Sequence, residues 1–395
     1  MQRLTLDRLA PFALLVLGTV LGLAGTDLVL PAIPALARDL GGTPAEAQWV
    51  LAAFTAGAAA GLLLFGALGA QQDWRRLLMV SAASFAAVSL AAACVDSIWL
   101  LIGLRFVQGA CGAAAAVFAP AVIRALFQGP HAVRALAAFG SIEAMAPALA
   151  PLAGAALLAR WDWRASFAVL AALGALLALA LRWQAGRLPE RLQLAADGSY
   201  VRLARNRCFV RLALSHAFSL AALLVIVFAA PAVFSRLSDA PVRAFVTMQM
   251  VGITAFVLVA NGAGLVIERF GALQLLRLGS LLSAVSSAAI FGAALLGMGQ
   301  TPVITVLFVL LCTGFGFRAP IGFHAALTSA QGDDTRAAAC IVVAMLLTTA
   351  LGTAVVAPFV DSGMAAPAAV AWLLACTAAV LGWRTAAPPA AGRAA

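Results

Sequence analysis

The sequence has little of the charge that keeps a soluble protein in water. It contains no lysine and a single tyrosine, and charged residues make up only 10% of its 395 residues. Soluble globular domains devote about a quarter of their residues to charged types. Hydrophobic residues instead reach 64% of this chain. No soluble fold would bury so much apolar surface, so the composition predicts a protein whose solvent is lipid.

Other classes of protein are excluded by what the sequence lacks. It has no G-x-x-x-x-G-K-[ST] segment for nucleotide phosphates, and its six cysteines form no C-x-x-C pair. Cysteines inside apolar runs are typical packing residues rather than metal or disulfide ligands. The net charge of +10 comes from arginines scattered singly between apolar runs, so no nucleic-acid partner is predicted. We predict no cofactor, no metal and no enzymatic activity.

Twelve apolar runs are long enough to cross a membrane, because a spanning helix needs about twenty mostly apolar residues. Backbone groups in lipid must be hydrogen-bonded within the segment, which favours helices. The first run is too long for the core of a signal peptide, so we expect an uncleaved helix. The predicted spans are 11–36, 45–69, 77–95, 98–127, 132–159, 165–183, 208–235, 243–267, 273–297, 302–330, 337–360 and 366–384.

The spans form two groups of six on either side of the longest polar stretch. We predict an N-terminal six-helix bundle over 1–183, a cytoplasmic linker loop over 184–207 and a C-terminal six-helix bundle over 208–395. Loops 66–73 and 264–271 occupy the same place in their groups and begin 198 residues apart. Parallel repeats of this kind are how many secondary transporters are built.

The placement of arginine predicts the orientation of the chain, since cytoplasmic loops carry an excess of basic residues. With a cytoplasmic N-terminus, 18 of the 25 arginines lie on the cytoplasmic side, five lie on the other side and two lie inside helices. We therefore predict an inner (plasma) membrane protein with both termini in the cytoplasm, which requires an even number of helices.

The loop between the eighth and ninth spans resembles the signature Gly-x-Leu-x-Asp-Arg-x-Gly of the major facilitator superfamily. The matching residues are Gly264, Glu268, Arg269 and Gly271. In that superfamily the acidic residue takes part in a gating clasp between helices, and the resemblance implies this role for Glu268 and Arg269. The first-half loop departs from the signature, because Ala70 and Gln71 stand where Asp and Arg are expected, and Asp73 follows three residues later.

The first half resembles the drug-efflux branch of the bicyclomycin-resistance (Bcr/CflA) type. Residues 26–34 are similar to its D-x-Y-L-P-A-L-P stretch, and residues 105–109 match R-x-x-Q-G. Residues 146–154 match a fifth-helix motif, A-P-x-x-A-P-x-x-G. The prolines and the last glycine of that motif are Pro147, Pro151 and Gly154. The likeness in detail covers roughly residues 20–170, while the second half matches mainly in layout.

The resemblance implies a fold class and a function. The fold is an all-α membrane protein with about 12 transmembrane helices in two six-helix bundles. The function is secondary active transport by alternating access, with proton-coupled export of small hydrophobic or cationic molecules by a monomer. The expected partners are the small-molecule substrate, protons and the lipid bilayer.

Three ionisable residues inside the predicted spans are candidates for proton coupling or substrate binding. A carboxylate in hydrocarbon is costly unless it is paired or protonated, so Asp27 in the first span is the candidate proton carrier. Arg105 in the fourth span would polarise that site or tether the first helix by hydrogen bonds. Glu143 in the fifth span would attract cationic substrates or carry a second proton. For each residue, the alternative is a structural contact between helices.

Five further residues are candidates for the lining of a cavity, because intramembrane polar groups normally face an interior. They are Gln48, Trp49, His216, Arg318 and His324. The resemblance implies that the first, fourth, seventh and tenth helices line a central cavity, and the last three residues lie on two of these. Histidine titrates near neutral pH, and an arginine would attract an anionic group. A packing role is the alternative for each residue.

The sequence leaves two other functions open. The first is a transporter of the same fold with a different substrate or direction of transport, which would be a metabolite exporter or a nutrient uptake permease. A non-transporting membrane sensor or scaffold would need a signalling domain, whereas the longest polar stretch covers only 184–207.

Overall fold

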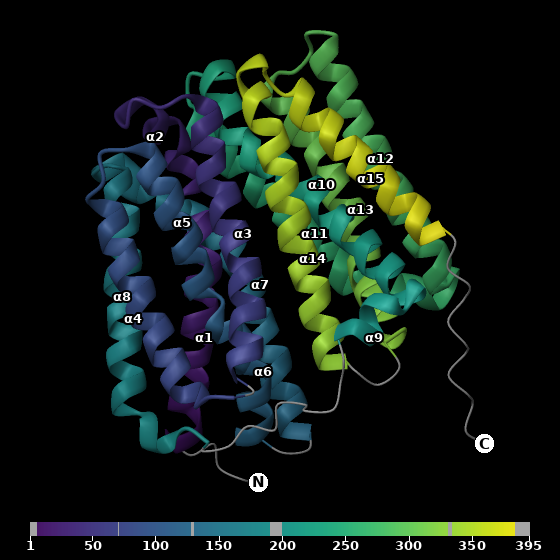
Figure 1. Cartoon of the computed structure of the whole chain (residues 1–395). Coiled ribbons are helices and arrows are strands. Elements are labelled where there is room, and N and C mark those ends of the chain that lie inside the picture. The colour runs from purple at the N-terminus through teal and green to yellow at the C-terminus, as the bar shows by residue number, and fades with distance from the viewer. Residues whose placement is uncertain (1–5, 70, 128–129, 190–199, 331–333, 384–395) are drawn as a thin grey trace, which may run out of the picture. The chain divides into compact units, whose positions relative to one another are not determined.

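The computed structural model describes residues 6–69, 71–127, 130–189, 200–330 and 334–383. Within these residues, 12 helical segments are long and apolar enough to cross a membrane, which confirms the predicted number and fold class. The chain divides into two compact units, Met1–Asp197 and Gly198–Ala395. Each unit is a bundle of helices that run side by side (Figure 1).

The first unit contains six of the membrane-crossing segments, and two of these are interrupted. The first segment is divided among α1, η1 and α2, and the fourth between α5 and α6. The elements are α1 (Leu6–Asp27), η1 (Leu30–Ala32), α2 (Ile33–Asp39), α3 (Pro44–Gly69), α4 (Trp74–Ala93), α5 (Ile98–Gly112), α6 (Ala114–Leu126), α7 (Pro130–Arg160) and α8 (Trp163–Trp183).

Glycines let the backbones of α3 and α5 approach each other closely. A side-chain carbon added to Gly57 of α3 would strike the backbone of Phe106, and one added to Gly109 of α5 would strike the backbone of Phe54. Small residues at such contacts are how membrane helices pack, because lipid offers no hydrophobic driving force between them. The tight contact places Arg105, the neighbour of Phe106, inside the unit.

The second unit surrounds one buried helix. Its elements are α9 (Tyr200–Arg205), α10 (Arg207–Leu237), α11 (Pro241–Phe270), α12 (Ala272–Leu295), α13 (Thr301–Thr328), α14 (Asp334–Val356), η3 (Ala357–Ser362) and α15 (Ala365–Trp383). Helix α10 packs against α11, α13, α14 and α15, and all residues from 225 to 234 are buried. A helix that is apolar on every side is expected at such a central position.

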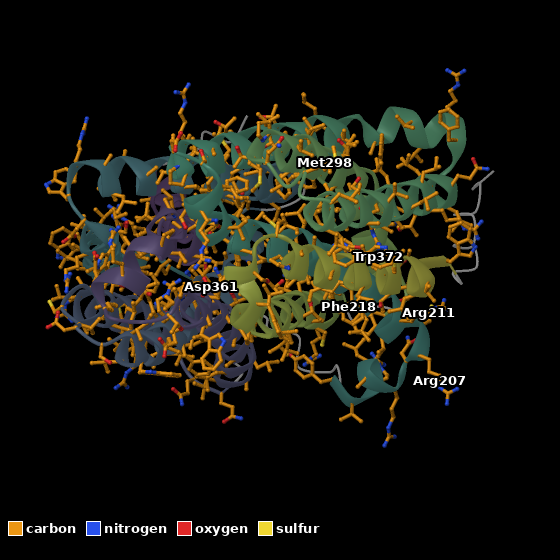
Figure 2. The ribbon with its side chains drawn as sticks, turned by 90° about the horizontal axis from the view of Figure 1, so that it is seen from above. Arg207, Arg211, Phe218, Met298, Asp361 and Trp372 are labelled. Carbon is orange, nitrogen blue, oxygen red and sulfur yellow. The ribbon has the colours of Figure 1, made fainter. Side chains whose placement is uncertain are left out.

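Both ends of the predicted linker loop, 184–207, are attached to a unit. At its start, Trp74 Nε1 donates a hydrogen bond to the carbonyl of Pro189 at 3.2 Å, beside η2 (Ala185–Arg187). At its end, Leu203 of α9 is buried and packs against Phe209 of α10. The arginines that follow, Arg207 and Arg211, lie at the opposite end of the second unit from Asp361 of η3 (Figures 1 and 2). The domain boundaries given above stay a prediction.

Candidate functional site

Asp27 is the last residue of α1, where the first membrane-crossing segment breaks. The backbone turns through Leu28 and Val29, whose N–H groups donate to Ala24 and Thr26. Pro31 has no N–H to donate to the carbonyl of Asp27, so an α-helical hydrogen bond is missing where α1 ends. The sequence predicted one continuous helix here, and this missing hydrogen bond contributes to the difference. The break leaves a half-buried carboxyl group within the span.

Arg105 is fully buried and joins three helices. Its Nη1 donates to the carbonyl of Gly25 in α1 at 2.7 Å and to Oε1 of Gln108 at 2.7 Å. Its Nε donates to the carbonyl of Val50 in α3 at 3.4 Å. Gly25 lies two residues before Asp27, and no ion pair joins Arg105 to Asp27 among the residues that the structure describes. This geometry is that of a tether on the backbone of the first helix.

Rings and a second polar residue complete the surroundings of Arg105. The guanidinium carbon lies 4.1 Å from the centroid of the Phe54 ring and 5.8 Å from that of Phe167. Gln108, itself fully buried, donates from Nε2 to Oγ of Ser89 in α4 at 2.7 Å. The sequence pointed to Gln108 only through the R-x-x-Q-G match. Ser89 was missed, because an isolated serine in an apolar run carries no signal of its own.

The break after Asp27 is also held from α7 and α8. Ser166 of α8 donates from Oγ to the carbonyl of Leu28 at 3.3 Å. A side-chain carbon added to Gly154 of α7 would strike that same carbonyl. The fifth-helix motif therefore packs on the break through its glycine. Pro147 and Pro151 lie in the same helix, which runs on through both of them.

Glu143 lies on α7 and is half-buried. Its side chain lies near Thr19 of α1, which is 3% exposed and whose hydroxyl donates to the carbonyls of Leu15 and Val16 at 3.0 Å. Thr19 precedes Asp27 by eight residues, which is about 12 Å along the axis of α1. The carboxyl group of Glu143, beside Thr19, and that of Asp27 therefore lie at different depths along this helix. Thr19 was not a sequence candidate, since hydroxyl residues are common in membrane helices.

Gln48 and Trp49 are neighbours in α3 with opposite surroundings. Gln48 is fully buried, and neither its Oε1 nor its Nε2 has a hydrogen-bond partner among the described residues. Trp49 is exposed and contacts Trp99 edge-on, with ring centroids 5.6 Å apart. Exposed tryptophans near helix ends are typical of the membrane interface. Only Gln48 is therefore placed inside the first unit.

The second unit brings Arg318 and His216 together. Arg318 of α13 is 1% exposed, and its Nη2 donates to the carbonyl of Ser215 at 3.1 Å and to Oγ of Ser215 at 2.9 Å. His216, the next residue of α10, is 4% exposed, with its ring centroid 5.6 Å from that of Phe323. His324 is exposed and makes no described contact with either residue. Ser215 was missed for the same reason as Ser89.

The two loops of the gating signature differ in structure. Asp73 caps the N-terminus of α4 by accepting from the backbone N–H of Arg75 at 3.0 Å. In the second loop, Gly271 has φ +81° between α11 and α12, a conformation that favours glycine. Arg269 is exposed, with its guanidinium carbon 5.6 Å from the centroid of the Phe270 ring. Gly264 lies within α11, while the side chain of Glu268 is outside the described residues, so the clasp stays a prediction.

The ionisable groups described above differ between the two units. The first unit holds the carboxyl groups of Asp27 and Glu143 and the guanidinium of Arg105, and the second holds Arg318 beside His216. Carboxyl groups can exchange protons, and charged groups away from water can recognise charged molecules. No group of three or more His, Cys, Asp or Glu side chains suited to a metal ion occurs in the described part of the chain. Twelve membrane-crossing helices in the described part of the chain, divided between two units with ionisable groups inside both, are typical of the class of membrane transporters.

Comparison with known families specifies that class. The Major Facilitator Superfamily matches residues 15–357, and the chain belongs to this family. Members of the family are transporters and not enzymes. The protein is therefore a multi-pass membrane protein that transports small molecules.

Several similar proteins are named as drug-resistance proteins. The chain is 27% identical to the bicyclomycin resistance protein homolog of Haemophilus influenzae, over 71% of this chain and 72% of that protein. It is 26% identical to the multidrug resistance protein MdtL of Salmonella newport, over 78% of this chain and 77% of that protein. A shorter match, to the chloramphenicol resistance protein of Pseudomonas aeruginosa, is 36% identical over 40% of this chain and 38% of that protein. These relatives confirm the resemblance to the drug-efflux branch.

Solved structures confirm the fold. A D-xylose-proton symporter aligns with a TM-score of 0.72 and 17% identity, over 95% of this chain and 97% of that one. A bacterial homolog of the human lysosomal transporter Spinster, inward-facing and occupied, aligns with a TM-score of 0.72 and 15% identity, over 96% and 97%. At these identities the likeness is one of fold alone.

Proposed function

We propose that this transporter exports small hydrophobic or cationic molecules across the bacterial inner membrane in exchange for protons, by alternating access. The observation that carries the proposal is the position of Asp27, a half-buried carboxyl group at a helix break inside the first span. A carboxyl group takes up or releases a proton as its surroundings become less or more polar. The names of the similar proteins, which refer to resistance to drugs, support export as the direction.

The coupling acts through the break itself. Arg105 and Ser166 hold the backbone carbonyls of Gly25 and Leu28, on either side of Asp27. The carboxyl group of Asp27 lies between these two carbonyls and makes no ion pair with a described residue. No cationic side chain among the described residues therefore neutralises its negative charge. Protonation removes that charge and lowers the cost of packing the break against apolar helices. A proton therefore shifts the balance between two conformations, as any ligand with unequal affinity does.

The energy of one proton is sufficient for this exchange. Each elementary charge that crosses the membrane gains about 2.3 kcal/mol per 100 mV, and a tenfold concentration ratio costs about 1.4 kcal/mol. One proton at 100 mV thus balances a gradient of about fiftyfold for a neutral substrate. A monovalent cation exchanged for one proton moves no net charge, so its export is driven by the pH gradient. Glu143, half-buried on α7, would attract such a cation.

A susceptibility and accumulation panel tests the proposed function. The chain is expressed in a bacterial host without its main efflux pumps, beside Asp27→Asn at an equal amount in the membrane. We expect wild type to lower the accumulation of several hydrophobic or cationic compounds and raise their inhibitory concentrations at least fourfold, and the variant to lose this effect. Raised accumulation of one polar nutrient would instead establish an uptake permease, and no change with any compound would overturn drug export.

A further inference from the structure

A cavity of about 410 Å³ lies in the second unit where α11 and α13 begin. Its walls come from the first two turns of both helices and from the turn that precedes α11. The polar side chains that line it are those of Ser238, Arg243, Thr247, Thr301 and Thr305, and no carboxylate of the described residues does so. The cavity is therefore basic and rich in hydroxyl groups.

The lengths of α11 and α13 place this cavity at the edge of the hydrocarbon. The helices have 30 and 28 residues, which at 1.5 Å per residue makes them about 45 and 42 Å long. The hydrocarbon core of a bilayer is about 30 Å thick, so each end of a centred, upright helix extends about 6 to 8 Å into the headgroup layer. Arg243 and Thr301, near the starts of their helices, lie in that layer. The cavity is therefore at the level of the lipid phosphate groups.

Arg243 gives the cavity a positive charge that no ion pair with a described residue neutralises. Its side chain is exposed, and Asp239, one turn earlier, lies outside the lining. Oγ of Ser238 accepts from a backbone N–H at 3.2 Å and keeps its own hydrogen to donate. The hydroxyls of Thr247 and Thr301 are further donors. Because α11 and α13 both begin here, the positive ends of their dipoles add to the charge.

An apolar strip, formed by Val251, Val306 and Leu310, continues from the cavity along the same two helices, which pack against each other. Val306 lines the cavity and is 62% exposed, and Leu310, one turn further along α13, is 42% exposed. Val251 follows Thr247 by one turn of α11 and is 46% exposed. Residues four apart share a helix face, so the strip runs on from the lining of the cavity. A phosphate in the cavity would thus have a surface for hydrocarbon chains directly below it.

We propose that this cavity binds the phosphate group of an anionic phospholipid, whose acyl chains lie along the apolar strip. An arginine guanidinium forms charge-assisted hydrogen bonds with phosphate oxygens, and the hydroxyls of the cavity donate to the oxygens that remain. A lipid is favoured over a free phosphate because only a lipid also covers Val306 and Leu310. In the predicted orientation the site faces the outer leaflet. It is independent of the cargo and of the direction of transport, so this proposal and the proposed function can each fail alone.

Photo-crosslinking of the full chain in lipid nanodiscs tests the site. Benzoylphenylalanine replaces Leu310, and the nanodisc contains equal amounts of phosphatidylglycerol and phosphatidylcholine with identical acyl chains. The mass of the adduct identifies the captured lipid. We expect at least threefold more phosphatidylglycerol than phosphatidylcholine at this position. The same probe in place of Leu373, an exposed residue in the third turn of α15, should capture the two lipids equally.

Two variants separate the charge of the site from its shape. Arg243→Gln removes the charge, whereas Ala244→Leu keeps the charge and fills the cavity, which Ala244 also lines. We expect each variant to bring the ratio of the two lipids at the Leu310 probe close to one. Arg160→Gln, which removes an exposed arginine at the end of α7, should leave the ratio unchanged.

Three results would overturn the proposal. The first is equal capture of the two lipids by the Leu310 probe in the otherwise wild-type chain, and the second is an unchanged ratio in both site variants. The third is loss of the preference for phosphatidylglycerol when glycerol 3-phosphate is added in excess, which would establish a site for free phosphate esters instead.

Discussion

Arg105 shows how a membrane protein can bury a cation without an acidic partner. Its Nε and Nη1 groups donate to the carbonyl oxygens of Gly25 and Val50 and to the amide oxygen of Gln108, while Nη2 has no hydrogen-bond partner among the described residues. The guanidinium carbon also lies 4.1 Å and 5.8 Å from the ring centroids of Phe54 and Phe167. Carbonyl dipoles and aromatic rings each stabilise a desolvated cation, and together they fix α1 to α3 and α5 at the level of Asp27.

Removal of this tether should destabilise the first unit. Arg105→Gln is too short to reach Gly25 and Val50, and hydrogen bonds to charged groups contribute about 1.5 to 3 kcal/mol each. We expect a loss of about 2 to 4 kcal/mol, seen as a lower midpoint of thermal unfolding in detergent. Arg160→Gln, at an exposed position of α7, is the control and should unfold like wild type. Equal midpoints for the two variants would show that Arg105 is not a structural tether.

Glu143 should discriminate between substrates by charge. Glu143→Gln keeps the shape of the side chain but removes the negative charge. We expect the KM for export of a monovalent cation to rise about tenfold, with little change for a neutral compound, because a half-desolvated carboxylate attracts only the former. Transport rates for a matched cationic and neutral pair in membrane vesicles measure this. A similar loss for both compounds would indicate a structural role.

The site was only partly predictable from the sequence. Asp27, Arg105 and Arg318 stand out because a charged residue in an apolar run is rare and costly. Ser89, which accepts from Gln108, and Ser215, which bonds to Arg318, do not stand out, since serine is tolerated anywhere in a membrane helix. The packing of helices distant in sequence decides which serine meets a buried polar side chain, and periodicity within one helix contains no information on that.

At the scale of elements, the helix break after Asp27 depends on its neighbours. Gly154 of α7 packs directly on the carbonyl of Leu28, and Ser166 of α8 donates to the same oxygen. The number of membrane-crossing segments followed from hydropathy alone. The break in the first segment has a local signal in Pro31, whereas the break at Ala113 in the fourth lies seven residues from the proline at 120 and has only the preceding Gly112 as a signal.

Two glycines of α7 provide a matched test of the packing on the break. Gly154→Ala puts a methyl group against the carbonyl of Leu28, while Gly140→Ala adds one where nothing lies within 4 Å. Overpacking costs about 1 to 3 kcal/mol, whereas alanine in an open helix position gains up to about 1 kcal/mol. We expect Gly154→Ala to lower the unfolding midpoint and impair export, and Gly140→Ala to do neither. The same result for both would mean that this contact is not needed.

At the scale of the whole molecule, the two units share a layout but differ in chemistry. Both contain six membrane-crossing segments, as the spacing of the two loops indicated. The spans of the first unit carry the carboxyl groups of Asp27 and Glu143, whereas those of the second carry Arg318 and His216. A few polar residues scarcely change the mean hydropathy of a span. A repeat found by hydropathy therefore predicts the fold of each half but not which charged side chains lie inside it.

The orientation of the molecule is a prediction that reporter fusions can test. Fusions after Arg8, within 190–205 and after Arg384 should report the cytoplasm, because arginine-rich segments are retained there. A fusion near Ala240, between α10 and α11, should report the opposite side. A periplasmic signal from 190–205 would contradict the arrangement of six spans on each side of the linker.

Proton-driven export is the central claim, and transport into proteoliposomes tests it most directly. A cationic compound found in the accumulation panel is supplied outside vesicles whose lumen is acidic. We predict uptake by wild type that collapses with a proton ionophore, and at least tenfold slower uptake by Asp27→Asn, which keeps the shape of the side chain but carries no proton. Uptake that is indifferent to the pH gradient, or undiminished in Asp27→Asn, would contradict the account.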